Sequence, residues 1–165
     1  NVKIGGSKGN RYVELPAEPA SSHGLLLFGP ALSKDLRVEA RFLAEDGEKS
    51  PTFAVGLNGL SGYRLQVNPN IQQLELLRNE VVVHSEKFEW LSGQWTYLSL
   101  QVRELPGLQW VVEGKAWYKK QAEPKKWTLK WRDTAAPSNG QPSVWGTPCG
   151  GKPIALDDVR LWTVE

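Results

Sequence analysis

Apolar and polar residues alternate along this chain in short runs that end at glycine, proline or asparagine. The clearest run reads Leu36, Arg37, Val38, Glu39, Ala40, Arg41, Phe42 and Leu43. Successive side chains of a β-strand point to opposite faces of a sheet, so this run predicts a strand with one buried face. Similar runs recur at spacings of roughly 8–12 residues, which is typical of an all-β sandwich or barrel.

About a dozen segments carry this strand signal. They are residues 11–15, 25–28, 36–43, 52–57, 63–67, 73–78, 81–88, 95–103, 108–118, 127–131, 143–145 and 154–162. Asn79-Glu80 predicts a hairpin turn, and Asn58-Gly59 predicts a connection with left-handed backbone positions. Residues 5–9 are rich in glycine and predict a flexible segment that leads into the domain. No segment keeps a helical apolar period for three turns, so no helix is expected.

The chain has 165 residues, which suits a single domain spanning residues 1–165. It contains no methionine, which suggests a processed chain or a domain cut from a longer protein. The 20 basic and 18 acidic residues are interspersed, and the densest basic run, from Lys119 to Lys126, is interrupted by Glu123 and Pro124. We interpret this run as a solvated loop and expect no nucleic-acid partner. No apolar run approaches the ~18 residues of a membrane span, so none is expected.

Residues that could carry metal or nucleophilic chemistry are few. Cys149 is the single cysteine, so no internal disulfide can form. His23 and His84 are isolated and predict surface or strand-edge positions rather than metal ligands. The chain has neither a nucleophile elbow nor a phosphate-binding glycine loop, and we predict no catalytic residue.

The polar positions of the predicted strands form the candidate binding site. The side chains opposite the core are expected to make one continuous polar surface, consisting of Arg37, Glu39, Arg41, Arg64, Gln66, Tyr97, Ser99 and Gln101. Ala54 and Gly56 leave room on that face, and arginine with glutamine and tyrosine can hydrogen-bond hydroxyls or clamp carboxylates. The alternatives are a solvated face with internal ion pairs, or a face that docks on another domain of the parent protein.

Eight tryptophans are an unusually large number for this length. Trp110 and Trp162 lie in apolar strands and are predicted to be core residues. Trp117, Trp127, Trp131 and Trp145 lie beside loops, where some are expected to be exposed. Trp117 joins the candidate binding residues, because an indole ring offers a large apolar surface with one polar handle.

The second half of the chain carries a family resemblance. Residues 92–98, Ser-Gly-Gln-Trp-Thr-Tyr-Leu, resemble the G-x-W-x-x-l strand opening of concanavalin A-like (laminin-G-like) domains. Residues 156–162, Leu-Asp-Asp-Val-Arg-Leu-Trp, resemble their closing f-D-D-v-r-v strand, and residues 112–117, 123–127 and 140–146 are similar to the segments between. The likeness extends to domains of secreted bacterial proteins, notably of planctomycetes, that are often appended to quinoprotein-like β-propellers. It implies an all-β, two-sheet antiparallel jelly-roll sandwich.

The resemblance also implies a concave sheet face that often binds glycans, and a secreted, periplasmic or cell-surface location. In related jelly rolls the first Asp of the closing strand, here Asp157, can ligate a structural calcium ion together with backbone carbonyls near the N-terminus. Calcium takes six to eight oxygen ligands. The alternative has Asp157 or Asp158 accepting hydrogen bonds from the amides of a neighbouring loop. No other cofactor is expected.

Some relatives of this fold are glycoside hydrolases. Laminarinase-type enzymes carry E-x-D-x-x-E on one strand, where alternation aims the carboxyl groups into the cleft. This chain has no such spacing. Glu39 faces the right way, but Arg37 and Arg41 beside it favour a permanently charged ion pair. We therefore expect that the protein is not an enzyme.

Three functions follow from the sequence. The first is a non-catalytic glycan-binding or cell-surface accessory module that uses the concave face. The second is an interdomain or protein-interaction module, which predicts an exposed patch that contains tryptophan. The third is a glycoside hydrolase, which requires two carboxylates within reach of each other in a cleft.

Overall fold

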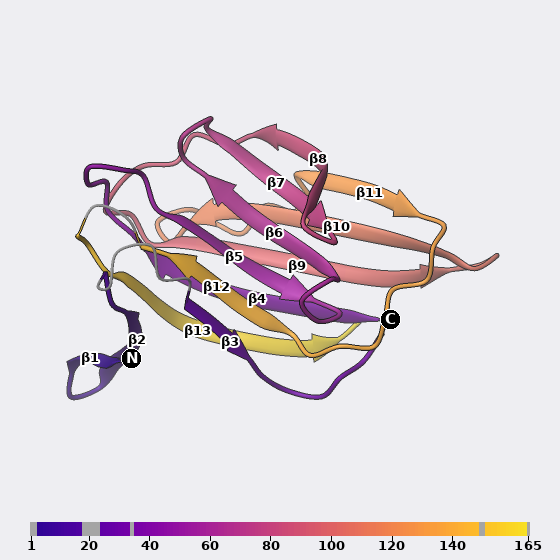
Figure 1. The fold of residues 1–165 in the computed structure, drawn as a ribbon, viewed down its shortest axis with the longest axis horizontal. Coiled ribbons are helices and arrows are strands. Elements are labelled where there is room, and N and C mark those ends of the chain that lie inside the picture. The colour runs from indigo at the N-terminus through magenta and orange to yellow at the C-terminus, as the bar shows by residue number, and fades with distance from the viewer. Residues whose placement is uncertain (1–2, 18–23, 34, 149–150, 165) are drawn as a thin grey trace.

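The computed structural model describes residues 3–17, 24–33, 35–148 and 151–164. This part of the chain contains thirteen strands and no helix (Figure 1). The strands are β1 (Lys3–Ser7), β2 (Asn10–Leu15), β3 (Gly24–Leu27), β4 (Leu36–Leu43), β5 (Thr52–Leu57), β6 (Tyr63–Asn68), β7 (Gln73–Arg78), β8 (Val81–Lys87), β9 (Thr96–Leu105), β10 (Gln109–Tyr118), β11 (Leu129–Asp133), β12 (Ser143–Thr147) and β13 (Ile154–Thr163). Within the described residues no helix is available that could cross a membrane.

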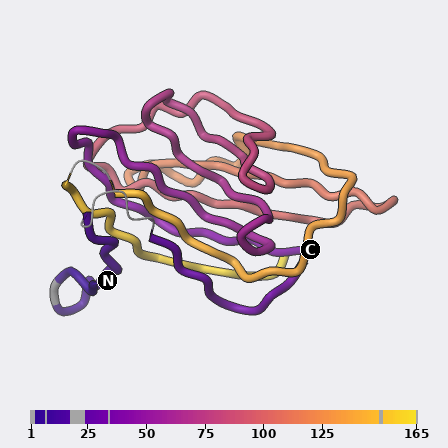
Figure 2. Tube along the Cα trace, viewed as in Figure 1, coloured from indigo at the N-terminus to yellow at the C-terminus, as the bar shows by residue number. Residues whose placement is uncertain are grey.

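The strands form two antiparallel sheets that lie one over the other (Figures 1 and 2). Sheet A has the order β1-β2-β13-β4-β9-β10-β11, and sheet B has the order β3-β12-β5-β6-β7-β8. The expected all-β, two-sheet antiparallel sandwich is therefore confirmed.

The apolar core lies between the two sheets. Val38 and Leu100 of sheet A, and Val55 and Leu65 of sheet B, all have 0% of their surface exposed and belong to one buried cluster. The predicted alternation of β4, β5, β6 and β9 is confirmed by these four residues. Because neighbouring side chains in a strand point in opposite directions, the polar residues between them face outward from the sandwich.

The predicted strand boundaries agree with the structure in most segments, and residues 36–43, 52–57 and 73–78 coincide with β4, β5 and β7. The flexible segment predicted at residues 5–9 is wrong, because Lys3–Ser7 pairs with β2 as a strand. Gly5 lies opposite Tyr12, and a Cβ on Gly5 would come within 2.5 Å of the Tyr12 ring. The glycine therefore makes room for the tyrosine in this hairpin.

The turn and core predictions have mixed outcomes. Asn79 and Glu80 both have positive φ, 49° and 64°, as a two-residue hairpin between β7 and β8 requires.

Trp110 is a core residue as predicted, whereas the core position predicted for Trp162 is wrong. Trp162 is 36% exposed, because it lies opposite Arg37 on the outward-facing side of β13. His84 lies partly exposed on the edge strand β8, as expected, and His23 and Cys149 lie outside the described residues.

A glycine of β10 determines how closely the two sheets approach. A Cβ on Gly114 would lie 2.6 Å from Cδ1 of Leu65 in the opposite sheet. Gly114→Ala should lower the free energy of unfolding by about 1–3 kcal/mol, because the added methyl group overfills the core. Urea unfolding measures this change. Adding Leu65→Ala should cost less in the Gly114→Ala background than in the wild type, and strict additivity of the two changes would contradict this packing.

Candidate functional site

The predicted binding residues divide between two opposite faces of the molecule. Arg37, Glu39, Arg41, Tyr97, Gln101 and Trp117 lie on the outer face of sheet A, and Arg64 and Gln66 lie on the outer face of sheet B. The expectation of one continuous polar surface is therefore wrong. Alternation correctly assigned these side chains away from the core, but β6 belongs to the other sheet, so its outward face points to the opposite side.

On the outer face of sheet A, polar and aromatic side chains bond mainly to one another. Arg37 donates to Ser99 Oγ at 2.7 Å, and its guanidinium lies 5.1 and 4.9 Å from the ring centroids of Trp127 and Trp162. Tyr97 stacks on Trp117 with ring centroids 5.1 Å apart and an interplanar angle of 9°. Glu39 accepts a hydrogen bond from Arg37, Arg41 is paired with Asp157, and Gln101 donates to Glu113, so the six predicted residues of sheet A are all bonded within the protein.

Residues 119–128, which join β10 to β11, pass over this layer, and we call them the strap. The Lys115 ammonium donates to the Pro124 carbonyl at 2.8 Å and to Glu123 at 2.7 Å. Arg37 bonds the same Glu123 carboxylate at 2.6 Å. Lys115 is only 4% exposed as a result. The strap therefore closes the part of the polar face that the sequence indicated as a binding site.

Arg41 forms ion pairs with two carboxylates at a β-bulge. The register of β13 against β4 shifts between Asp157 and Arg160, and Asp158 has a positive φ of 51°. A bulge of this kind re-aims a side chain, and both Asp157 and Asp158 bond the Arg41 guanidinium. Burial alone would raise the pKa of Asp157, but the hydrogen bonds from Arg41 and the Asp158 amide, together with the charges of Arg41 and Lys119, hold that pKa below its ordinary value.

This arrangement bears on the predicted calcium ligand. Asp157 accepts hydrogen bonds from Arg41 and from the backbone amide of Asp158. The Arg41 guanidinium is thus already paired with the carboxylate that would bind calcium. The described residues contain no group of three His, Cys, Asp or Glu side chains suited to a metal ion. Calcium at Asp157 therefore stays a prediction.

Glu39 and Glu123 are two carboxylates brought together on sheet A. Both accept hydrogen bonds from the same nitrogen of Arg37, at 3.1 and 2.6 Å. Burial raises the pKa of Glu39, whereas hydrogen bonds from Lys115 and Arg37 lower the pKa of Glu123. Opposite shifts are typical of an acid–base pair. The Arg37 guanidinium, however, lies between the two carboxylates where a glycosidic bond would have to lie, so the geometry favours an ion-pair cluster.

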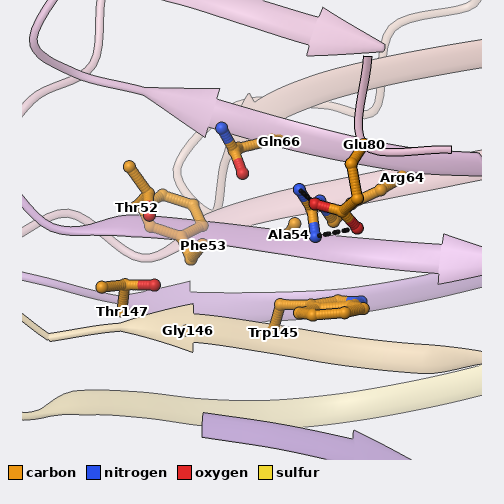
Figure 3. A pocket seen from close by; sticks show the side chains of 9 residues that line it. All are labelled: Thr52, Phe53, Ala54, Arg64, Gln66, Glu80, Trp145, Gly146 and Thr147. Atoms are coloured by element: carbon orange, nitrogen blue, oxygen red, sulfur yellow. Dashed lines mark hydrogen bonds and ion pairs between the residues drawn. The ribbon is translucent and has the colours of Figure 1, made fainter. Parts of the chain in front are cut away.

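The outer face of sheet B has a different character, because its central strand carries small residues. Ala54 of β5 lies in register between Trp145 of β12 and Gln66 of β6, and Gly56 lies between Ser143 and Arg64. The small side chains leave a hollow of about 270 Å³ over β5 (Figure 3). It is lined by Thr52, Phe53, Ala54, Arg64, Gln66, Glu80, Trp145, Gly146 and Thr147.

An arginine held between an aromatic ring and a carboxylate forms one wall of the hollow. The Arg64 guanidinium lies 4.6 Å from the centroid of the Trp145 ring, and it donates to both carboxylate oxygens of Glu80, at 3.1 and 2.8 Å. The Trp145 indole donates to Ser143 Oγ at 2.8 Å, which fixes the ring. Glu80 is 61% exposed, so this wall presents both donors and acceptors to solvent.

A second carboxylate lies beside the hollow. Glu75 of β7 is 6% exposed and accepts hydrogen bonds from the amides of Gln66, at 3.1 Å, and Asn68, at 3.2 Å. These bonds orient the Gln66 side chain, whose carbonyl oxygen remains an acceptor. The hollow therefore combines the Trp145 ring with fixed amide, guanidinium, carboxylate and hydroxyl groups.

Sequence reasoning found Arg64 and Gln66 in this site but missed Trp145, Glu80 and Glu75. Glu80 could have been predicted from the Asn79-Glu80 turn. This turn directly follows β7, and because β7 pairs with β6, the turn brings Glu80 close to Arg64. Trp145 had no such local signal. It reaches the hollow only because β12 pairs with β5, which lies about ninety residues earlier in the chain.

Several solved structures are similar to this chain. The carbohydrate-binding module CBM66 from Bacillus subtilis has a TM-score of 0.65 at 12% identity, covering 99% of this chain and 92% of that one. The exoplasmic/lumenal domain of VIP36, in its Ca²⁺/Man3GlcNAc-bound form, has a TM-score of 0.64 at 11% identity, covering 100% and 83%. Lectin II from Ulex europaeus has a TM-score of 0.58 at 8% identity, covering 99% and 91%.

These likenesses confirm the predicted fold, a jelly-roll sandwich of the concanavalin A-like lectin type. At such low identities they show the fold alone. No protein-family model matches the chain, and no curated protein matches it either.

The ion pairs of sheet A predict opposite pH effects for two buried carboxylates. Burial alone would raise the pKa of Glu113, but hydrogen bonds from Arg103 and Lys130 outweigh it and lower that pKa, so its stabilising effect is lost as pH falls below the ordinary value of 4.5. Glu113→Gln should therefore cost about 1–3 kcal/mol near pH 7, and less near pH 3.

Glu39→Gln is the matched control, because the raised pKa of Glu39 favours its protonated form in the folded state. This substitution should cost less at neutral pH than at acid pH. Urea unfolding of both variants at the two pH values measures these differences. The same direction of change in both variants would contradict the assignment.

Proposed function

We propose that this domain is a non-catalytic glycan-binding module whose site is the hollow on the outer face of sheet B. The observation that carries the proposal is the wall formed by Trp145, Arg64 and Glu80 above the small residue Ala54. Sites for small ligands are concave and combine apolar surface with a few fixed polar groups. This hollow has that composition, whereas the predicted residues of sheet A are bonded to one another.

The chemistry of the wall suits a sugar. A pyranose or furanose ring carries C–H surfaces that pack on an indole ring, and hydroxyl groups that both donate and accept hydrogen bonds. Arg64 and Gln66 supply donors, and Glu80 with the Gln66 carbonyl supplies acceptors. Because Glu80 holds the guanidinium with two hydrogen bonds, the donors are already oriented before a ligand binds, which lowers the entropic cost of binding.

The charge of the site favours a neutral ligand. Arg64 is paired with Glu80, and Glu75 beside them is held by amides rather than by a cation. The hollow therefore has no surplus positive charge to attract an acidic sugar. We accordingly propose neutral glycans as the ligand class.

The fold neighbours also support the proposal. They include a protein described as a carbohydrate-binding module and a lumenal domain bound to Man3GlcNAc. The sequence resemblance to secreted domains points in the same direction, and we propose a secreted, periplasmic or cell-surface location with it. Neither the hollow nor the Arg37 cluster offers two free carboxylates facing each other across a cleft, and this supports a non-catalytic function.

One observation favours the alternative function of contact with another protein or domain. Strand β3 exposes Leu25 and Leu27 by 40% each, directly beside Trp145 and Ser143 in the register of sheet B. Exposed apolar side chains in a row are typical of protein contacts. If no glycan binds at millimolar concentration, this alternative becomes the better account of the same face.

Three substitutions test the hollow. Trp145→Ala and Arg64→Ala should each weaken binding of a neutral glycan at least tenfold, which corresponds to about 1.4 kcal/mol, because each removes part of the wall. Ala54→Leu should do the same by filling the floor while leaving every polar group in place. A neutral glycan array followed by calorimetry on the hits provides the measurement.

Trp162→Ala is the matched control for Trp145→Ala, because Trp162 also stacks on an arginine but lies on the opposite sheet. It should leave glycan binding unchanged. Equal losses in Trp162→Ala and Trp145→Ala, or binding that survives Ala54→Leu, would defeat the assignment of the hollow.

A further inference from the structure

The outer face of sheet A carries a larger positive charge than the net charge of the whole chain, +2, indicates. We consider the outward side chains of β4, β9, β10, β11 and β13 together with the strap. Five cations on this face are paired with five carboxylates, and their charges cancel: Arg37, Arg41, Arg103, Lys115 and Lys130 with Glu39, Glu113, Glu123, Asp157 and Asp158.

Six further cations on this face are exposed, and none has an ion-pair partner among the residues that the structure describes. They are Lys119, Lys120, Lys125, Lys126, Arg132 and Arg160. The whole chain has a net charge of +2, so six unpaired charges here leave the rest of the molecule with a net charge of −4 (2 minus 6). The protein is therefore strongly polarised, with one basic side.

The sequence pattern suggested a short, interrupted basic run in a solvated loop, and the fold changes that interpretation. Glu123, which interrupts the run, is paired with Arg37 and Lys115, although its side chain is 46% exposed. Arg132 of β11 and Arg160 of β13, which are distant in sequence, join the four strap lysines on the same side of sheet A. Ion pairing thus neutralises the acidic interruption, and the fold extends the basic surface.

We propose that this basic face is a second binding surface, and that its ligand is an acidic polysaccharide that carries repeated carboxylate or sulfate groups. Six cations spread over a sheet face, without a hollow to enclose one group, suit a chain of anions held by many weak contacts. Each contact releases a condensed counterion, so the affinity depends steeply on salt. The surface lies on the side opposite the neutral hollow, so the two ligands do not compete.

The aromatic residues of this face favour a polysaccharide over a nucleic acid. Single-stranded nucleic acids bind through bases stacked on free aromatic rings. Here Trp117 is stacked by Tyr97, and Trp127 and Trp162 are stacked by Arg37, so these rings are engaged within the protein.

The experiment uses dextran sulfate and polygalacturonate as probes, with duplex DNA and anionic phosphatidylserine vesicles as competing anions. Binding of at least one polysaccharide should weaken tenfold or more between about 50 and 200 mM salt. The variant with Lys119, Lys120, Lys125 and Lys126 all changed to Gln should lose at least tenfold in affinity at the lower salt concentration.

The matched control changes four exposed lysines elsewhere, Lys8, Lys49, Lys87 and Lys152, to Gln, which removes the same net charge. It should retain binding within about twofold, and thermal unfolding should confirm that both variants fold. Equal losses in the two quadruple variants would overturn the proposal, as would DNA or vesicles binding as tightly as the polysaccharides. Trp145→Ala should leave polysaccharide binding unchanged, so failure of this proposal and failure of the glycan hollow are separate results.

Discussion

The whole account depends on the packing of two antiparallel sheets through alternate side chains. Val38 and Leu100 from one sheet meet Val55 and Leu65 from the other in a single buried cluster. Once these positions are buried, every intervening residue must face away from the core. The polar residues of sheet A and those of sheet B therefore point in opposite directions, and no single small ligand can contact both sets.

The two outer faces differ because of the size of the residues that they carry and what covers them. On sheet B, Ala54 and Gly56 are too small to fill the space between Trp145 and Arg64, so a hollow remains open to solvent. On sheet A, long charged side chains fill the corresponding space, and the strap places Glu123 between Arg37 and Lys115. Sheet A therefore carries more of the charged residues that the sequence indicated as a binding site, but these residues form hydrogen bonds and ion pairs with one another.

The sequence predicts local features of this fold well and long-range features poorly. The segments 36–43, 52–57 and 73–78, and the turn at Asn79-Glu80, follow from alternation and turn chemistry, which act between near neighbours. Sheet membership depends instead on pairings such as β12 with β5 and β13 with β4, which close long loops and leave no local pattern. That is why Arg64 was grouped with Arg37, and why Trp145 was missed. The bulge at Asp158 was also missed, because one aspartate with positive φ inside an otherwise continuous strand segment does not mark a bulge in the sequence.

Titration of the isotope-labelled protein with a neutral glycan, followed by amide and indole NMR shifts, tests the central claim most directly. The eight tryptophan indoles report on both faces at once. We expect the shifts to concentrate at the Trp145 indole and at the amides of Ala54 and Gln66, with Trp117 and Trp162 unmoved. Shifts concentrated at Trp117 and Trp162 would place the ligand on sheet A and contradict the account.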